Sequence, residues 1–364
     1  MVKKTSSFSI SAERGVTKVV GIIANPVSAR DIRRIVSYAG SLQVTDRANI
    51  VLRLLSGLAA TGIEEVVMMP ENAGIRGHLK RNMMRAANMG EARFPKLRFL
   101  DMPVTGQAED SINAAVMMRK LDVGAIIVLG GDGTHRAVVS GCGNTAIAGV
   151  STGTNNAFPE TREPTITGLA VGLAVTGQVP SEVAFFFNKR LEVSINKHRE
   201  IALVDVAIVN DGFIGSRAIW KTESFRELFV TFAESGGIGM SSIVGLLAPV
   251  DRSSPYGRRL IFAPKNGSAK TVTAPIAPGL LESIGIEKVE KLLFDQPQHL
   301  TVKAGTIAFD GERELSFTEK DDISVTLHEG AFRTVDVTAC MAYAASEGIF
   351  INHRMQPNNS KQEN

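Results

Sequence analysis

Three apolar runs constrain the fold of this chain more than any other feature of its sequence. They are KVVGIIANP (Lys18–Pro26), VGAIIVLGG (Val123–Gly131) and NTAIAGVST (Asn144–Thr152). A strand that is apolar at successive positions is buried on both faces, which is typical of a parallel sheet. The stretches 49–62 and 108–122 have the apolar spacing of amphipathic helices. Strands that alternate with helices predict an α/β domain with a parallel, helix-covered sheet over residues 15–160.

The second half of the chain has a different pattern. Residues 161–330 consist mainly of short strand-like segments separated by turn signals, which predicts an antiparallel β sandwich or a layered sheet. One helical insertion is expected within this part, over Thr222–Gly237. Residues 331–352 are expected to return to the first domain as a helix or a strand. Residues 353–364 are polar and are expected to form a frayed tail.

Composition excludes several classes of protein. The chain has 40 Lys+Arg against 37 Asp+Glu, and its aromatic residues are not interleaved with basic clusters, so we expect no nucleic-acid partner. Cys142 and Cys340 are far apart, which predicts neither a disulfide framework nor a zinc motif. No apolar stretch is long enough to span a membrane, and no signal-peptide core follows the basic N-terminus. We therefore expect a cytoplasmic protein.

Two glycine-containing loops follow neighbouring strands of the predicted parallel sheet. The first is GGDGT (Gly130–Thr134) and the second is STGTNNA (Ser151–Ala157). A glycine loop before a helix can hold a phosphate on backbone N–H groups, because no Cβ blocks the approach and the helix dipole favours an anion. The alternative is a tight turn in which Asp132 or Thr134 caps the helix. Two such loops at one sheet edge favour phosphate binding over that alternative.

GGDGT after an apolar strand resembles the NAD kinase and diacylglycerol kinase superfamily. Within it, the chain is most similar to the acetoin-catabolism X-type branch, described as ATP-dependent NAD kinase-like. The resemblance extends over residues 18–335 and also includes ANPVS, GTNN and two segments of the second half, which are TAPIAPGLL (Thr273–Leu281) and IAFDGERELSFTEKDDISV (Ile307–Val325).

The resemblance implies a kinase with an α/β domain, a β-sandwich domain and an active site in the crevice between them. It implies ATP and Mg²⁺, with the 2′-hydroxyl of NAD as phosphoryl acceptor and NADP as product. Asp132 would be the catalytic carboxylate that activates this hydroxyl, and the ligands of the metal stay unassigned. It also implies a homodimer or a higher homo-oligomer. The residues expected to contact nucleotide are Gly130, Gly131, Gly133, Thr134, Gly153, Thr154, Asn155, Asn156, Asp205, Asp310 and Glu312.

Some residues depart from the NAD kinase pattern. Val204 and Asp205 stand where NAD kinases have an Asn-Glu pair, and SGGIGMSSI (Ser235–Ile243) replaces a loop that carries a tyrosine. Its glycines and serines could still hold an anion. Asp310-Gly311 is by itself a hairpin signal, whereas Asp-Gly-Glu also occurs in diacylglycerol kinase-like enzymes, where the glutamate is a candidate base. A kinase of another alcohol (lipid, polyol or sugar) and a non-catalytic nucleotide sensor are the alternatives. We expect His135 on a helix surface.

Overall fold

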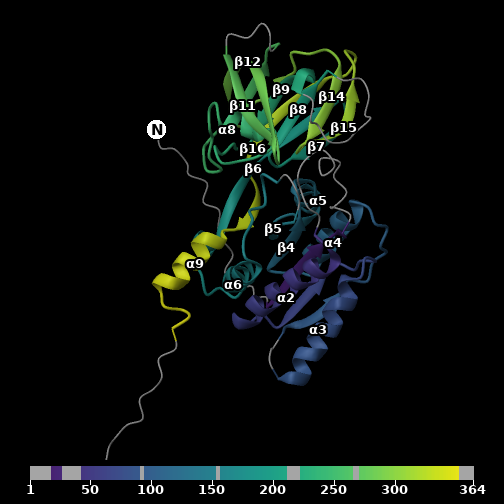
Figure 1. The fold of residues 1–364 in the computed structure, drawn as a ribbon, viewed down its shortest axis with the longest axis vertical. Coiled ribbons are helices and arrows are strands. Elements are labelled where there is room, and N and C mark those ends of the chain that lie inside the picture. Colours follow the sequence, from purple (N-terminus) through teal and green to yellow (C-terminus); the bar gives the residue numbers. More distant parts are fainter. Residues whose placement is uncertain are drawn as a thin grey trace, which may run out of the picture.

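The chain folds into an α/β domain and a β domain, which two long strands connect (Figure 1). The computed structural model describes residues 18–26, 42–90, 94–152, 156–210, 222–264 and 270–351. This architecture confirms the predicted fold class, a parallel-sheet α/β domain followed by an antiparallel β domain. No helix among these residues is both long enough and apolar enough to cross a bilayer.

The sheet of the first domain has the strand order β3-β2-β1-β4-β5-β16-β6-β7. The first five strands pair in parallel. Their order reverses between β1 and β4, and in open α/β sheets ligands bind beyond the carboxyl ends of the strands at such a reversal. The strands are β1 (Val19–Ala24), β2 (Glu65–Met68), β3 (Lys96–Phe99), β4 (Ala125–Gly130), β5 (Ala146–Ser151), β6 (Phe185–Ile195), β7 (His198–Ala202) and β16 (Ile323–Val335), with β13 (Gln298–His299) also paired to β16.

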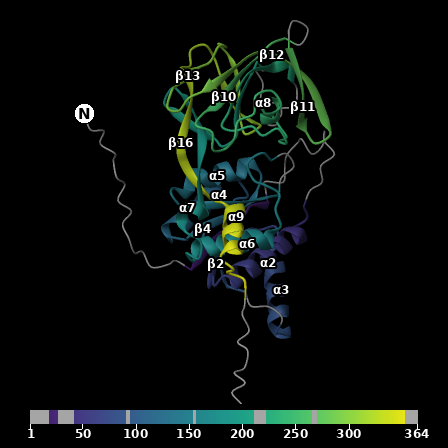
Figure 2. The same ribbon diagram turned by 90° about the vertical axis from the view of Figure 1, so that its left-hand side faces the viewer.

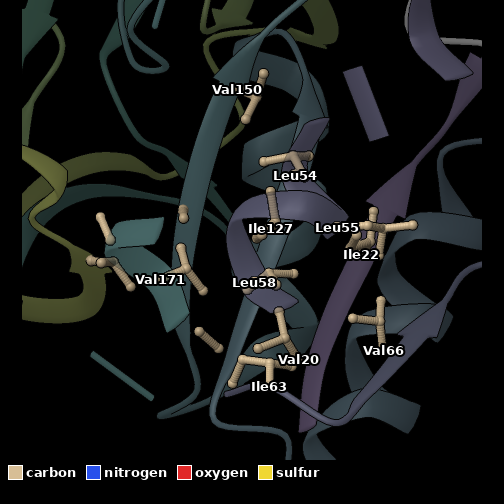
Figure 3. Close-up of a cluster of buried hydrophobic side chains, with 14 of the residues drawn as sticks. Val20, Ile22, Leu54, Leu55, Leu58, Ile63, Val66, Ile127, Val150 and Val171 are labelled. Atoms are coloured by element: carbon tan, nitrogen blue, oxygen red, sulfur yellow. The ribbon is translucent and has the colours of Figure 1, made fainter. Parts of the chain in front are cut away.

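Helices cover both faces of the parallel strands. In β4, Ile127 contacts the core under α2, α6 and α9, while Ile126 contacts the core under α4 and α5. Figure 3 shows the first core, in which Leu54 and Leu58 of α2 lie near Ile127 and Leu55 lies beside Ile22. The helices are α2 (Val44–Ala60), α3 (Ile75–Met89), α4 (Glu109–Lys120), α5 (Asp132–Cys142), α6 (Pro164–Val175), α7 (Ser181–Ala184) and α9 (Val337–Ser346).

Helices α2 and α6 pack closely because each of them presents a glycine to the backbone of the other. A Cβ on Gly168 would lie 2.4 Å from the carbonyl oxygen of Leu54, and one on Gly57 would lie 2.5 Å from that of Thr165. This contact makes α6 part of the α/β domain, whereas the sequence analysis ends that domain at residue 160. The chain therefore enters the β domain only at β6.

We expect Gly168→Ala to destabilise the chain by about 1–3 kcal/mol, because the added methyl group overlaps the Leu54 carbonyl. The measurement is urea unfolding. Gly77→Ala in α3 is the matched control, since its nearest neighbour would be a flexible arginine end at 3.5 Å. That change is expected to stabilise by about 0.5–1 kcal/mol, because alanine is the better helix former. Equal effects at both positions would contradict the close packing of α2 and α6.

The β domain is built on a second, antiparallel sheet with the order β11-β12-β10-β9-β8-β14-β15. One face of it packs on the upper parts of β6, β7 and β16, with Phe229, Phe309 and Leu327 in the core between the layers. The other face packs on α8 (Ser241–Gly245). The strands are β8 (Asp205–Val209), β9 (Phe225–Val230), β10 (Gly257–Phe262), β11 (Lys270–Ala277), β12 (Leu280–Leu292), β14 (Gly305–Phe309) and β15 (Glu312–Phe317).

Strands β6 and β16 belong to both domains. Their antiparallel pairing runs from Ile323↔Ile195 in the β domain to Val335↔Phe185 in the α/β domain, with a register shift between His328 and Phe332. Below this shift β16 also pairs with β5, and the chain continues into α9 on the outside of the α/β domain (Figure 2). Residues 331–351 thus lie in or beside the first domain, and the predicted tail beyond residue 351 lies outside the described residues.

The predicted helix over Thr222–Gly237 is wrong. Within this segment, Thr222–Ser224 form one 3₁₀ turn and Phe225–Val230 form β9. Five of the six β9 residues are buried, because the strand lies between β8 and β10 and is covered on both faces. Tertiary burial therefore overrides the helix-like spacing of its apolar residues.

Candidate active site

The GGDGT loop lies at the carboxyl end of β4, at the order reversal of the sheet and beneath the β domain (Figure 1). Helix α5 begins at Asp132 itself. The Asp132 side chain is 8% exposed, and its two oxygens accept hydrogen bonds from the N–H groups of Ala157 (3.0 Å) and Phe158 (2.9 Å). The loop after β5 is thereby fixed to the loop after β4, as expected for two loops at one sheet edge.

The three glycines of the motif have different surroundings. A Cβ on Gly130 would lie 2.5 Å from the Thr134 side chain, and a Cβ on Gly131 would lie 2.6 Å from Oδ1 of Asn156. Gly130 is therefore required for packing against Thr134, and Gly131 leaves room for the Asn156 side chain. At Gly133 the nearest atom to an added Cβ is Oε1 of Glu312, at 3.9 Å. Gly133 is therefore the glycine that faces the second domain.

The loop after β5 is partly described. Asn156 donates from Nδ2 to the hydroxyl of Ser151 (2.8 Å), and Thr152 donates its N–H to the carbonyl of Gly130 (3.2 Å). Helix α6 is capped by Glu163, whose carboxylate accepts from the N–H of Ile166. The remaining predicted contacts of this loop, Gly153, Thr154 and Asn155, lie outside the described residues.

Asp310 and Gly311 form the tight turn between β14 and β15. Both have positive φ, 49° and 82°, as a two-residue hairpin of type I′ requires. The Asp310 carboxylate also accepts hydrogen bonds from the N–H groups of Leu203, Val204 and Asp205 at 2.8–3.3 Å. Burial raises the pKa of Asp310, while Arg136 and these three amides act in the opposite direction. The buried side chain thus holds the turn before β8.

The other predicted residues of the second domain divide into buried and half-buried groups. Val204 is fully buried and Asp205 is 4% exposed. Glu312 is half-buried and lies near Gly133. In the segment Ser235–Ile243, Ser242 is buried and donates its hydroxyl to the carbonyls of Gly239 and Pro275. The Ser242 hydroxyl is therefore engaged within the β domain and is not offered to an anion.

Two arginines contact the opposite domain, one from each side. Neither contact was predicted from the sequence. Arg136 of α5 lies 3.8 Å from the Asp310 carboxylate and over the Phe309 ring. Arg252 of the β domain donates from Nη2 to the carbonyls of Ala157 (3.0 Å) and Phe158 (3.1 Å). Arg136 stands one helical turn after Asp132, a spacing that places both on one face of α5 and could have drawn attention to it. No sequence signal marks Arg252, because its hydrogen-bond acceptors in the α/β domain are backbone carbonyls 94 and 95 residues away.

His135 is fully buried and not on the helix surface as predicted. Its Nδ1 lies 2.8 Å from the carbonyl oxygen of Gly131, and its ring packs against Phe158. Burial lowers the pKa of this imidazole to about 4, against a smaller opposing effect of the Gly131 hydrogen bond. A neutral ring that donates from Nδ1 therefore fixes the carbonyl at the start of α5.

This burial predicts a pH-dependent stability. The unfolded chain binds a proton at His135 below about pH 6.5, whereas the folded chain does so only below about pH 4, so stability falls as the pH decreases between these values. The loss is at most about 3 kcal/mol. In urea unfolding from pH 7 to pH 4.5, His135→Asn should lack this part of the pH dependence. His198→Asn, at an exposed histidine, is expected to keep it; if both variants behaved alike, the assignment to His135 would be wrong.

The described residues contain no cluster of three or more His, Cys, Asp or Glu side chains arranged to hold a metal ion. A Mg²⁺ ion that arrives with a nucleotide does not need such a cluster. It keeps several waters and is held by phosphates together with one or two carboxylates. The Glu312 carboxylate beside Gly133 fits this requirement.

Comparisons with known proteins agree with the resemblance drawn from the motifs. Residues 20–176 match the family model of the ATP-NAD kinase N-terminal domain, and residues 189–330 match that of the acetoin catabolism protein X C-terminal domain. Acetoin catabolism protein X of Cupriavidus necator is 49% identical over 338 residues, covering 92% of this chain and 94% of that protein.

Two solved structures of a proposed diacylglycerol kinase from Bacillus anthracis are more distant. Both are 14% identical, with TM-scores of 0.47 and 0.42; each covers 88% of this chain, and the chain covers 98% and 99% of theirs. A similarity at this level carries no functional argument. The relative at 49% identity does establish the family. The chain belongs to the acetoin catabolism protein X family and has an N-terminal domain of the ATP-NAD kinase type.

Proposed function

We propose that the chain is an ATP-dependent kinase that transfers the terminal phosphoryl group to the 2′-hydroxyl of NAD, giving NADP. The observation that carries this proposal is the meeting of the two domains at the GGDGT loop, where Glu312 faces Gly133 across the start of α5. The N-terminal domain is of the ATP-NAD kinase type. Phosphoryl transfer depends mostly on positioning and on charge stabilisation, so a glycine loop and a few carboxylates are chemically sufficient.

In this proposal, Asp132 activates the acceptor hydroxyl. The two amide donors from Ala157 and Phe158 orient the Asp132 carboxylate. The start of α5 offers a favourable dipole to phosphate. The nucleotide would contact Gly133 together with Gly153, Thr154 and Asn155. Mg²⁺, held by phosphate oxygens and Glu312, would offset the charge of the transferred group.

Three predicted contacts have a supporting place in this proposal. Gly130 and Gly131 let Thr134 and Asn156 pack against the loop. Asp310 holds the turn at Asp205 and thereby the hairpin that carries Glu312. These residues would shape the nucleotide site from behind, with no direct contact to phosphate.

One observation favours a second candidate, a kinase of another alcohol such as a lipid, a polyol or a sugar. The turn where NAD kinases have an Asn-Glu pair here has a fully buried Val204 and a nearly buried Asp205, and Asp310 is engaged in holding that turn. This turn therefore offers the dinucleotide little polar contact. Glu312 would then be the carboxylate nearest the acceptor.

The deciding experiment incubates the purified chain with ATP, Mg²⁺ and NAD, and follows NADP with an NADP-specific dehydrogenase. Steady NADP formation supports NAD as acceptor. If ATP raises the melting temperature but no NADP forms, radiolabelled ATP is tested with a polyol, a sugar and a diacylglycerol in vesicles. Labelling of one of these supports the second candidate. Binding without any transfer would contradict both and would indicate a nucleotide sensor.

A further inference from the structure

A single peptide group connects the β domain to the candidate catalytic carboxylate. The carbonyl of Ala157 accepts a hydrogen bond from Nη2 of Arg252 (3.0 Å), and the N–H of Phe158, which belongs to the same peptide group, donates to Oδ1 of Asp132 (2.9 Å). The peptide group is planar and rigid, so it cannot rotate without weakening both bonds. Donation into its carbonyl also polarises its N–H, which strengthens the bond to Asp132.

Arg252 is itself held firmly. Its guanidinium lies 4.0 Å from the centre of the Phe232 ring and 5.4 Å from that of Phe158, and its Nε is 3.3 Å from a carboxylate oxygen of Glu234. The same Nη2 also donates to the carbonyl of Phe158 (3.1 Å). A planar guanidinium held at several points has a more fixed position than a flexible ammonium would have. The Ala157 carbonyl that it contacts is therefore held more firmly relative to the β domain.

We propose that Arg252 is a positioning residue that orients Asp132 through the peptide group between Ala157 and Phe158. The arginine comes from the β domain and the aspartate from the α/β domain. The orientation of the Asp132 carboxylate therefore depends on how the two domains are placed relative to each other. The catalytic role of this positioning rests on the proposed function. The structural coupling between Arg252 and Asp132 is independent of that function and can be measured without any substrate.

The alternative is that Arg252 only holds the domains together. Arg252 and Phe158 line an interdomain cavity of about 320 Å³, and an arginine at such a place stabilises an interface whatever the loop does. The two roles differ in their dependence on Asp132. A mere interface contact contributes the same amount with or without the Asp132 carboxylate, whereas a positioning contact loses its effect on the loop once that carboxylate is gone.

Hydrogen exchange of the Ala157 and Phe158 amides, followed by mass spectrometry on the full chain, separates these roles. Arg252→Met keeps an apolar stem between the two phenylalanine rings but removes the donors, and it should accelerate exchange of these amides about ten-fold or more. Asp132→Asn should do the same. The double variant should exchange about as fast as the faster single variant. Arg252→Lys keeps the charge with a less rigid donor and should be intermediate; it also decides the question should the methionine variant fail to fold.

Arg258→Met is the matched control, because Arg258 also lies in the β domain but stacks on Tyr256. It should leave exchange at residues 157 and 158 unchanged. Unchanged exchange in Arg252→Met would overturn the proposal. So would a double variant in which the accelerations caused by Arg252→Met and by Asp132→Asn multiply. Where turnover is measurable, Arg252→Met should lower kcat while the KM for ATP stays within about two-fold. A chain that shows the exchange coupling but forms no NADP would refute only the proposed function.

Discussion

Asp132→Asn is expected to reduce phosphoryl transfer by about 10²–10⁴-fold, the usual contribution of a positioned general base. The asparagine has one acceptor oxygen in place of two, so only one of the Ala157 and Phe158 amides keeps its partner, and the side-chain NH₂ faces the other. Both the proton acceptor and the geometry of the loop are therefore lost. The measurement is initial-rate kinetics with ATP, Mg²⁺ and the acceptor that the wild-type chain uses.

Binding of ATP separates the two losses. If Asp132 acts on the acceptor, the melting-temperature increase that ATP gives should persist in Asp132→Asn while turnover disappears. Turnover within three-fold of wild type would exclude Asp132 as the activating carboxylate. In that case Glu312, the half-buried carboxylate beside Gly133, would be the next residue to replace.

Asp310→Ala is expected to cost about 3–5 kcal/mol of stability, one of the largest losses that a single substitution should cause in this chain. The change leaves three backbone N–H groups without their buried acceptor and removes the carboxylate that lies 3.8 Å from the Arg136 guanidinium. It also places alanine at φ 49°, where a side chain without a polar group is disfavoured. Urea unfolding gives the free energy, and activity should fall too because Glu312 sits on the same hairpin.

Asp321→Ala is the control for this prediction. Asp321 also accepts backbone and side-chain hydrogen bonds in a β turn, from Thr318 and Asn196, but it is only half-buried, so water reaches the groups that lose their acceptor. We expect a clearly smaller loss than for Asp310→Ala. Asp310→Asn separates the effect of backbone conformation from that of the carboxylate. Because asparagine tolerates positive φ, the stability that this variant loses reports on the carboxylate alone. Similar losses at Asp310 and Asp321 would show that burial of the Asp310 network is not what stabilises the turn.

The sequence predicted the α/β half well because its signals are local. Continuous apolar runs such as Val123–Gly131 indicated strands buried on both faces, and helical spacing indicated α2 and α4. In the β domain the same reasoning failed at β9. An internal strand that is buried on both faces has a continuous apolar run, as a buried helix also can. Periodicity alone therefore could not distinguish a strand from a helix here.

The sequence by itself determined the alternation of strands and helices in the α/β domain, the GGDGT loop at the end of a buried strand and the hairpin at Asp310-Gly311. Only the tertiary structure decided what these residues touch. Gly130 and Gly131 make room for Thr134 and Asn156, and Asp310 holds a turn that begins about 100 residues earlier in the chain. Arg252 reaches Asp132 through a backbone peptide group, a partner that every residue type provides. The physical reason is that local conformation follows from nearby residues, whereas these contacts arise only when distant segments pack together.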